Sequence, residues 1–321
     1  MARLVFKDHS LLWHNGSDYP KIPLTVVSWD SDPDTAVAYV YFGHVNVDFD
    51  GSPTAYAPPG SGLTGDDDLG NAFDSTHWFG VVALSATDAA VQSGDAQIDQ
   101  RDEVKVGGKF PVIQQAKNDD PNPGYYVSST PQPTGAEYRQ DSYVDASRVA
   151  YGALSDKFQA LGVALGDYGL ALRHDQNLQS GFYFVDTGYG YKLGECSHKV
   201  GKDLGGSGRG NSFNNNFPVS FIVFPQSGTQ DPRGIVSASD DAIADALKPL
   251  LTKLSAAENA NELPMLMGYN EIAPQGQPSG TAKLAAYKQN PAGATRPSNY
   301  DNLAEALKSW GYSETDLSLD L

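Results

Sequence analysis

Residues 218–225 read Pro-Val-Ser-Phe-Ile-Val-Phe-Pro, an almost continuous apolar run between two prolines. A short apolar run rich in Val, Ile and Phe is typical of a strand that is buried on both faces. Proline cannot donate a ladder hydrogen bond, so Pro218 and Pro225 mark the two ends of the strand. We therefore expect Val219–Phe224 to lie centrally in a sheet.

Similar short runs rich in Val, Tyr, Phe and Ile recur before this segment, separated by clusters of Gly, Pro, Asn and Asp. This spacing predicts a mainly β fold for residues 1–228. The other predicted strands are 24–28, 36–42, 81–84, 125–128, 143–151 and 181–186. The long loops between them are 51–70, 118–124, 130–137 and 201–216. Loops of this length in a compact domain are often functional.

The pattern becomes helical in the last part of the chain. Ile and Leu recur at helical spacing behind Ser239, a typical N-cap, and Pro249 is expected to kink or split this helix. A second helix is predicted over 300–310 and ends at Gly311. We therefore expect residues 229–321 to form a helical C-terminal extension that packs on the β-rich domain. No element is assigned to the stretch between the two helices.

Charge and composition exclude several classes of function. The 321 residues carry a formal net charge of -17, which repels nucleic-acid phosphates and favours a cationic partner. The sequence contains no stretch of 18 apolar residues, so we expect no membrane-spanning helix. Cys196 is the single cysteine, so no intramolecular disulfide can form. Charge interrupts the first apolar residues, which predicts no signal peptide in this chain.

The most informative segment for chemistry runs from Gly181 to Ser197 and contains Asp186 and Glu195. The nine-residue spacing puts these carboxylates on opposite faces of a strand and half a turn apart on a helix. Only a chain reversal brings them together, and glycines at 188 and 190 permit one. Two such carboxylates suit glycoside hydrolysis, although a solvated surface turn explains the same pattern.

The same segment resembles the active-site region of glycoside hydrolase family 75, the endo-chitosanases. The resemblance covers roughly residues 36–228. It is carried by four further stretches in the same order, Asn46–Gly51, Tyr126–Thr130, Tyr143–Asp145 and Val219–Gly228. It implies that Asp186 and Glu195 are the essential acids. It also implies a double-psi-barrel-like core, cleavage of internal β-1,4 links of chitosan with inversion, and a secreted or extracellular enzyme.

Several residues beside the two acids are candidates for binding substrate. Tyr189 and Tyr191 add aromatic faces to the same loop, and Asp48 and Asp50 lie in the resembling acidic stretch. These four residues are the predicted substrate-binding set, and Asp66, Asp67 and Asp68 are expected to line the same cleft. Glu195 follows Leu193 and Gly194 in a less polar setting than Asp186, which favours Glu195 as general acid.

Residues 46–51 also fit the start of an EF-hand calcium loop, but Ala57 occupies the position of its bidentate Glu. We therefore expect no metal and no cofactor. Trp78 is either a sugar platform or a core residue, and His198 is more typical of a structural histidine than of a catalytic one. The predicted partner is a polysaccharide substrate, a cationic polymer of glucosamine. We expect the protein to be a monomer and to bind neither nucleic acid nor a membrane. A peptidoglycan-cleaving enzyme and a non-catalytic carbohydrate-binding protein remain alternatives.

Overall fold

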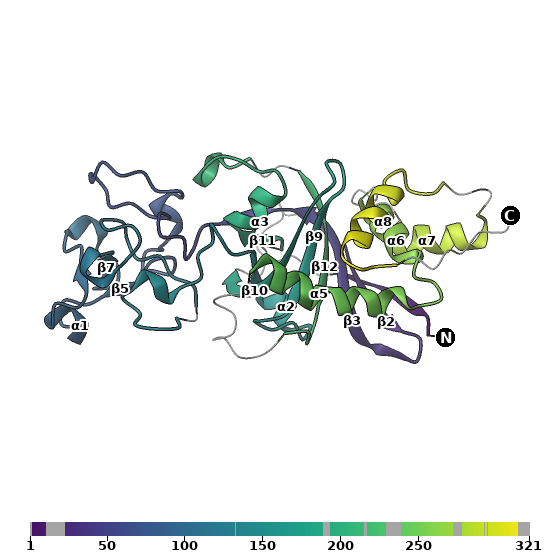
Figure 1. Ribbon diagram of the computed structural model, residues 1–321, viewed down its shortest axis with the longest axis horizontal. Coiled ribbons are helices and arrows are strands. Elements are labelled where there is room, and N and C mark those ends of the chain that lie inside the picture. Colours follow the sequence, from purple (N-terminus) through teal and green to yellow (C-terminus); the bar gives the residue numbers. More distant parts are fainter. Residues whose placement is uncertain are drawn as a thin grey trace.

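The protein is elongated, with a loop-rich lobe at one end, a large sheet in the middle and a group of helices at the other end (Figure 1). The computed structural model describes residues 2–10, 23–131, 133–188, 193–214, 217–228, 239–271, 278–291, 293 and 295–313. The chain is mainly β, as the sequence predicts.

The central sheet has nine strands in the order β1-β2-β3-β12-β9-β10-β8-β11-β4. Their bounds are β1 Leu4–Ser10, β2 Pro23–Trp29, β3 Asp32–His44, β4 Asn46–Asp48, β8 Tyr151–Ser155, β9 Tyr168–Arg173, β10 Leu178–Gly188, β11 Glu195–Ser197 and β12 Pro218–Phe224. β12 pairs antiparallel with β3 and β9, so the prediction of a central strand is confirmed. The pairs β8/β10 and β4/β11 are parallel, which makes the sheet mixed. Among the described strands the order is open, running from β1 at one edge to β4 at the other.

An inserted lobe, residues 49–143, leaves the sheet after β4 and returns before β8. Its regular elements are β5 Ala83–Leu84, α1 Ala89–Gln92, β6 Gln97–Ile98 and β7 Phe110–Ile113, with 3-10 turns at Leu69–Asn71, Asp102–Val104, Ala116–Asn118 and Gln140–Ser142. The short strands pair in the order β5-β7-β6. Two small apolar cores hold the lobe together, one around Tyr56 and Tyr126 and the other around Val112 and Val127.

Three of the predicted strands fall in or beside this lobe. The second half of 81–84 is a strand, β5, whereas the other two predictions are wrong over most of their length. Residues 125–128 make only isolated bridges, and of 143–151 only Tyr151 belongs to a strand. Tyr126 and Tyr143 are buried in the small cores, so their apolar character reflects packing without a strand ladder.

The described helices are α2 Asp156–Gln159, α3 His198–Asp203, α5 Asp240–Ser255, α6 Glu262–Glu271, α7 Gly280–Gln289 and α8 Tyr300–Ser309, with a further 3-10 turn at Gly210–Ser212. The Ser239 side chain caps α5 as predicted, and Gly311 at φ 89° follows α8. Of the kink or split predicted at Pro249, the structure excludes the split, because α5 continues through this residue. Pro249 lies on the exposed side of α5, where water can satisfy the carbonyl that its ring leaves unpaired.

The helices pack on the sheet through their apolar faces, which confirms that part of the prediction. α5 contacts β9 and β10, and α6 contacts β3 and β12. Leu247, Leu251 and Leu303 share one buried core with Phe221 and Val223 of β12. The division of the chain at residue 228 stays a prediction. Within the described residues, no helix has the length and apolar character that crossing a membrane requires.

Candidate functional site

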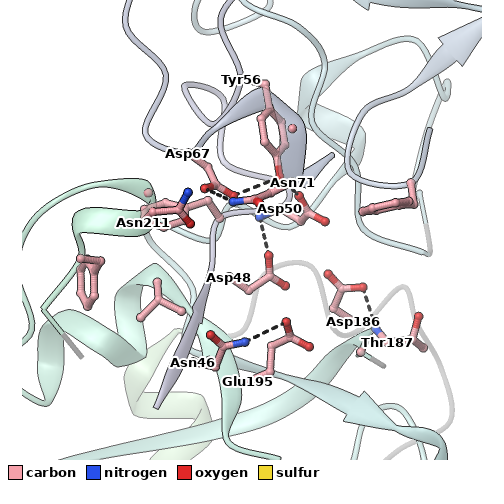
Figure 2. A pocket seen from close by; sticks show the side chains of 17 residues that line it. Asn46, Asp48, Asp50, Tyr56, Asp67, Asn71, Asp186, Thr187, Glu195 and Asn211 are labelled. Carbon is pink, nitrogen blue, oxygen red and sulfur yellow. Dashed lines mark hydrogen bonds between the residues drawn. The ribbon is translucent and has the colours of Figure 1, made fainter. Parts of the chain in front are cut away.

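A cleft of about 550 Å³ lies between the central sheet and the inserted lobe, since both contribute residues to its lining. Its floor comes from β4, β10 and β11, and its wall comes from the lobe and from the loop before β12. The lining residues are Asn46, Val47, Asp48, Phe49, Asp50, Tyr56, Asp67, Gly70, Asn71, Phe79, Asp186, Thr187, Gly188, Glu195, Gly210, Asn211 and Phe213. Figure 2 shows Asp48, Asp186 and Glu195 pointing toward the same space from the floor.

Strand pairing brings the two predicted acids to this floor. β10 runs parallel to β8, whereas β11 runs antiparallel to β8, so the chain direction reverses between Asp186 and Glu195. β11 also pairs in parallel with β4, which sets Glu195 beside Asn46 and Ser197 beside Asp48. The site therefore joins segments that are about 140 positions apart in the sequence, since Asp48 and Asp186 line one cleft.

Three carboxylates crowd together at the centre of the cleft. One oxygen from each of Asp48, Asp50 and Asp186 lies within 4.8 Å of the other two. The Asp50 backbone N–H donates to Asp48 Oδ1 at 2.8 Å, and the Tyr56 hydroxyl donates to Asp50 Oδ1 at 2.6 Å. The Thr187 N–H donates to Asp186 Oδ1 at 2.6 Å. These contacts hold the carboxyl groups in fixed positions (Figure 2).

Burial and mutual repulsion change how these carboxyls titrate. Asp186 is 5% exposed, and burial, followed by the negative charges of Asp48 and Asp50, raises its pKa well above the ordinary value. The pKa of Asp50 is raised well above the ordinary value by the same two causes, burial first and then the charge of Asp48. Asp186 therefore keeps a proton to higher pH than a solvated aspartate, which is the state that a general acid needs.

Glu195 lies in a more open place than Asp186, which corrects the expected order of burial. Its side chain is partly exposed, and Asn46 Nδ2 donates to Glu195 Oε1 at 3.3 Å. A Cβ on Gly188 would collide with Glu195 Oε2, so glycine at this position gives the carboxylate its room. The neighbouring Leu193 and Cys196 are buried in the core and are not part of the cleft lining. Apolar neighbours in the sequence were therefore a poor guide to burial of this side chain.

The lobe contributes a fourth aspartate to the cleft. Asp67 Oδ1 accepts from Asn71 Nδ2 at 2.9 Å and from the Asp68 N–H at 2.8 Å, and burial raises its pKa. The two flanking acids are not lining residues: Asp66 lies 3.4 Å from Arg209 Nε, and Asp68 accepts from Asn211 Nδ2 at the edge of the cleft. Of the three acids expected at the cleft, the structure places only Asp67 in its lining.

Aromatic side chains divide between the lobe core and the cleft. Trp78 is partly buried against the core around Tyr126, with ring centroids 6.5 Å apart, so the core reading is confirmed. Its neighbour Phe79, which the sequence analysis did not single out, is exposed and lines the cleft. Tyr189 and Tyr191 lie outside the described residues.

His198 is buried beneath the cleft. Its ring centroid lies 4.7 Å from that of Phe49 and 5.5 Å from that of Phe213, and burial lowers its pKa. A neutral ring packed between two aromatic rings fits the structural role that the sequence favours.

The three central carboxylates also form a donor set that suits a hard divalent cation. Asp48, Asp50 and Asp186 supply carboxylate oxygens, the ligands that Mg²⁺, Mn²⁺ and Ca²⁺ prefer. A bound cation would compete with the protons that the raised pKa values of Asp50 and Asp186 favour. The expected absence of a metal stays a prediction.

Comparison with known proteins adds no relative to this description. No protein-family model matches the chain, and no curated protein matches it either.

Proposed function

We propose that the protein is a glycoside hydrolase that cleaves internal β-1,4 links of chitosan. The observation that carries the proposal is one cleft lined by two carboxyls in different settings. Asp186 is buried with a raised pKa, whereas Glu195 is partly exposed beside Asn46. Glycosidases use such a difference, because one carboxyl must carry a proton while the other accepts one.

In this mechanism Asp186 is the general acid and Glu195 is the general base. Asp186 gives its proton to the glycosidic oxygen as the bond between that oxygen and the anomeric carbon breaks. Glu195 takes a proton from a water molecule, whose oxygen forms the new bond to the anomeric carbon on the opposite face. The product is the inverted hemiacetal, an outcome that needs room for one water between the two carboxyls.

The charge of the cleft favours an amino-sugar polymer over a neutral one. Four aspartates and Glu195 contribute carboxyls to the lining, and the whole chain carries a net charge of -17. Chitosan is a polycation at mildly acidic pH, so long-range attraction concentrates it at such a surface. Salt screens this attraction over roughly 10 Å at 0.1 M, so the KM for chitosan should rise with salt.

The resemblance to glycoside hydrolase family 75 supports the same reaction. The family's double-psi-barrel-like core, its export from the cell and its inverting outcome belong to this proposal as predictions. Part of the resembling sequence also lines the cleft. This part comprises residues of the segment Asn46–Gly51 and the two acids Asp186 and Glu195.

Release of reducing ends tests the proposal directly. The purified chain is incubated at about pH 5.5 with chitosan, with fully acetylated chitin and with peptidoglycan, and new reducing ends are counted. Products from chitosan, absent in the Asp186→Asn and Glu195→Gln variants, are the expected result. Release from peptidoglycan alone would support a cell-wall hydrolase instead. Binding to any of the three without release would support a carbohydrate-binding protein.

A further inference from the structure

Phe79 is an unusual side chain for the surface of this protein. Among the described residues, the large hydrophobic side chains classed as exposed are Leu63, at 41%, and Phe79, at 39%. Leu63 lies away from the cleft, whereas Phe79 is part of its lining. An exposed aromatic ring in a cleft that is lined by five carboxyl side chains needs an explanation that general surface composition does not give.

The backbone holds Phe79 firmly at this place. The N–H groups of Phe79 and Gly80 both donate to the Ala72 carbonyl, at 2.9 and 3.1 Å. The preceding residue, Trp78, packs into the lobe core with its ring centroid 4.6 Å from that of Phe73. The backbone around Phe79 is therefore anchored on both sides. A ligand that covers the ring loses little affinity to ordering of the backbone.

The same backbone sets Phe79 beside the acids. A Cβ on Gly80 would lie 2.6 Å from Asp50 Oδ1, so the absent side chain lets that carboxylate approach the backbone directly. Ala72, which fixes Phe79, follows Asn71, and Asn71 Nδ2 donates to Asp67 Oδ1. Figure 2 shows Asp67, Asn71 and Asp50 together on the lobe side, across from Asp186 and Glu195 on the floor.

We infer that Phe79 and Asp67 form a subsite for one glucosamine unit, on the lobe side of the cleft. A pyranose ring has an apolar C–H face and a polar edge, and an aromatic ring covers the first while a carboxylate binds the second. Phe79 packs against the C–H face, and Asp67 binds the ammonium group at C2. The inference rests on the proposed function for its substrate and adds the residues that select the free amine.

Binding measurements test the subsite apart from catalysis. Glu195→Gln serves as the parent, and its affinities for the glucosamine hexamer and the N-acetylglucosamine hexamer are measured by calorimetry at pH 5.5. Adding Phe79→Ala should weaken the binding of both hexamers about threefold to tenfold, and Phe79→Trp should restore it. Adding Asp67→Asn should weaken only the glucosamine hexamer, by about fivefold.

Leu63→Ala is the matched control, since it removes an equally exposed apolar side chain outside the cleft. Affinities in Phe79→Ala equal to those in Leu63→Ala would overturn the stacking role. Equal losses for both hexamers in Asp67→Asn would overturn the selection of the amine, and no binding of either hexamer to the parent would overturn the subsite.

Cleavage by the unmodified chain is assayed separately. A chain that binds the glucosamine hexamer through Phe79 yet cleaves nothing would refute the proposed function and leave the subsite standing. If the unmodified chain cleaves chitosan but Phe79→Ala binds the hexamers as well as its parent does, the subsite is refuted and the proposed function stands.

Discussion

Buried acids have different neighbours at the cleft and at the junction between the helices and the sheet. In the cleft, oxygens of Asp48, Asp50 and Asp186 lie within 4.8 Å of one another. At the junction, Glu262 lies 2.9 Å from Lys288 Nζ, and Glu271 Oε1 lies 2.6 Å from His174 Nδ1. The junction acids are thus paired with a lysine and a histidine, whereas the three central cleft acids lie against other acids.

Under the proposed function, this difference separates groups that hold the fold together from groups that bind and cleave the substrate. A carboxylate paired with a cation lowers the energy of the folded state, while like charges in contact raise it. Crowding acids against one another is therefore unfavourable for folding, and a positively charged substrate or a shared proton gives it a purpose. The comparison predicts that substitutions at the two places will have opposite effects.

The largest expected effect is on activity. Glu195→Gln should reduce the rate of chitosan cleavage by about two to four orders of magnitude and leave the melting temperature almost unchanged. Glu271→Gln, the matched change at the junction, should leave the rate intact and cost about 2 kcal/mol of unfolding free energy, because it weakens the contact with His174. Reducing-end release and urea unfolding measure the two quantities. Near-normal activity in folded Glu195→Gln would remove Glu195 from the mechanism.

The second effect is a pH dependence at the junction. The close contact with the Glu271 carboxylate raises the pKa of His174. A raised histidine pKa stabilises the fold fully below the unfolded value of about 6.5, and this stability is lost as pH rises through the folded value. The melting temperature of the unmodified chain should therefore fall as the pH rises above about 6.5, and this fall should be absent in His174→Gln. At about pH 6 the same variant should lose about 1.5 kcal/mol of unfolding free energy. The same slope in His174→Gln would show that another group causes it.

The smallest effect is a gain of stability at the cleft. The pKa of Asp186 is raised in the folded state, so its contribution to folding stability is greatest below the pKa of about 3.9 that it has in the unfolded chain. This contribution is lost as the pH rises through the pKa of the folded state. Asp186→Asn keeps the oxygen that accepts from Thr187 but removes the charge. It should be more stable than the unmodified chain by about 1 kcal/mol at pH 8, with no gain at pH 3, while losing activity. A loss of stability at pH 8 would contradict the contrast between the two regions.

The sequence predicted the fold best where burial follows a regular period. Val219–Phe224 is apolar on both faces, and the structure places it between β3 and β9. The lobe was harder, because Tyr126 and Tyr143 are buried by contacts from distant loops and not by a ladder. α6 was missed because it is buried nearly all round, from Leu263 to Asn270, and so shows no amphipathic period.

Spacing alone predicted the site only for residues that are close in sequence, whereas Asp48 and Asp50, which also line the cleft, were predicted from the family resemblance of Asn46–Gly51. Asp186 and Glu195 stand nine positions apart, and the glycines at 188 and 190 indicated the reversal that brings both acids to the cleft. Phe79 carried no comparable signal, since its neighbour Trp78 is the larger aromatic and turned out to face the core. The burial order of the two acids depends on β8 and β4, which come from far away in the chain.

The parallel pairing of β4 with β11 also bears on the order of folding. It comprises three residue pairs, and Asn46 and Glu195 are 149 positions apart. Closing so long a loop for so few hydrogen bonds is entropically costly, so this pairing should form after the antiparallel hairpins β2/β3 and β9/β10 have stabilised the sheet. Asp48 and Glu195 would then meet only in the last step of refolding. After dilution from denaturant, recovery of catalytic activity should lag behind recovery of the β-sheet circular dichroism signal, and simultaneous recovery would show that β4 and β11 pair early.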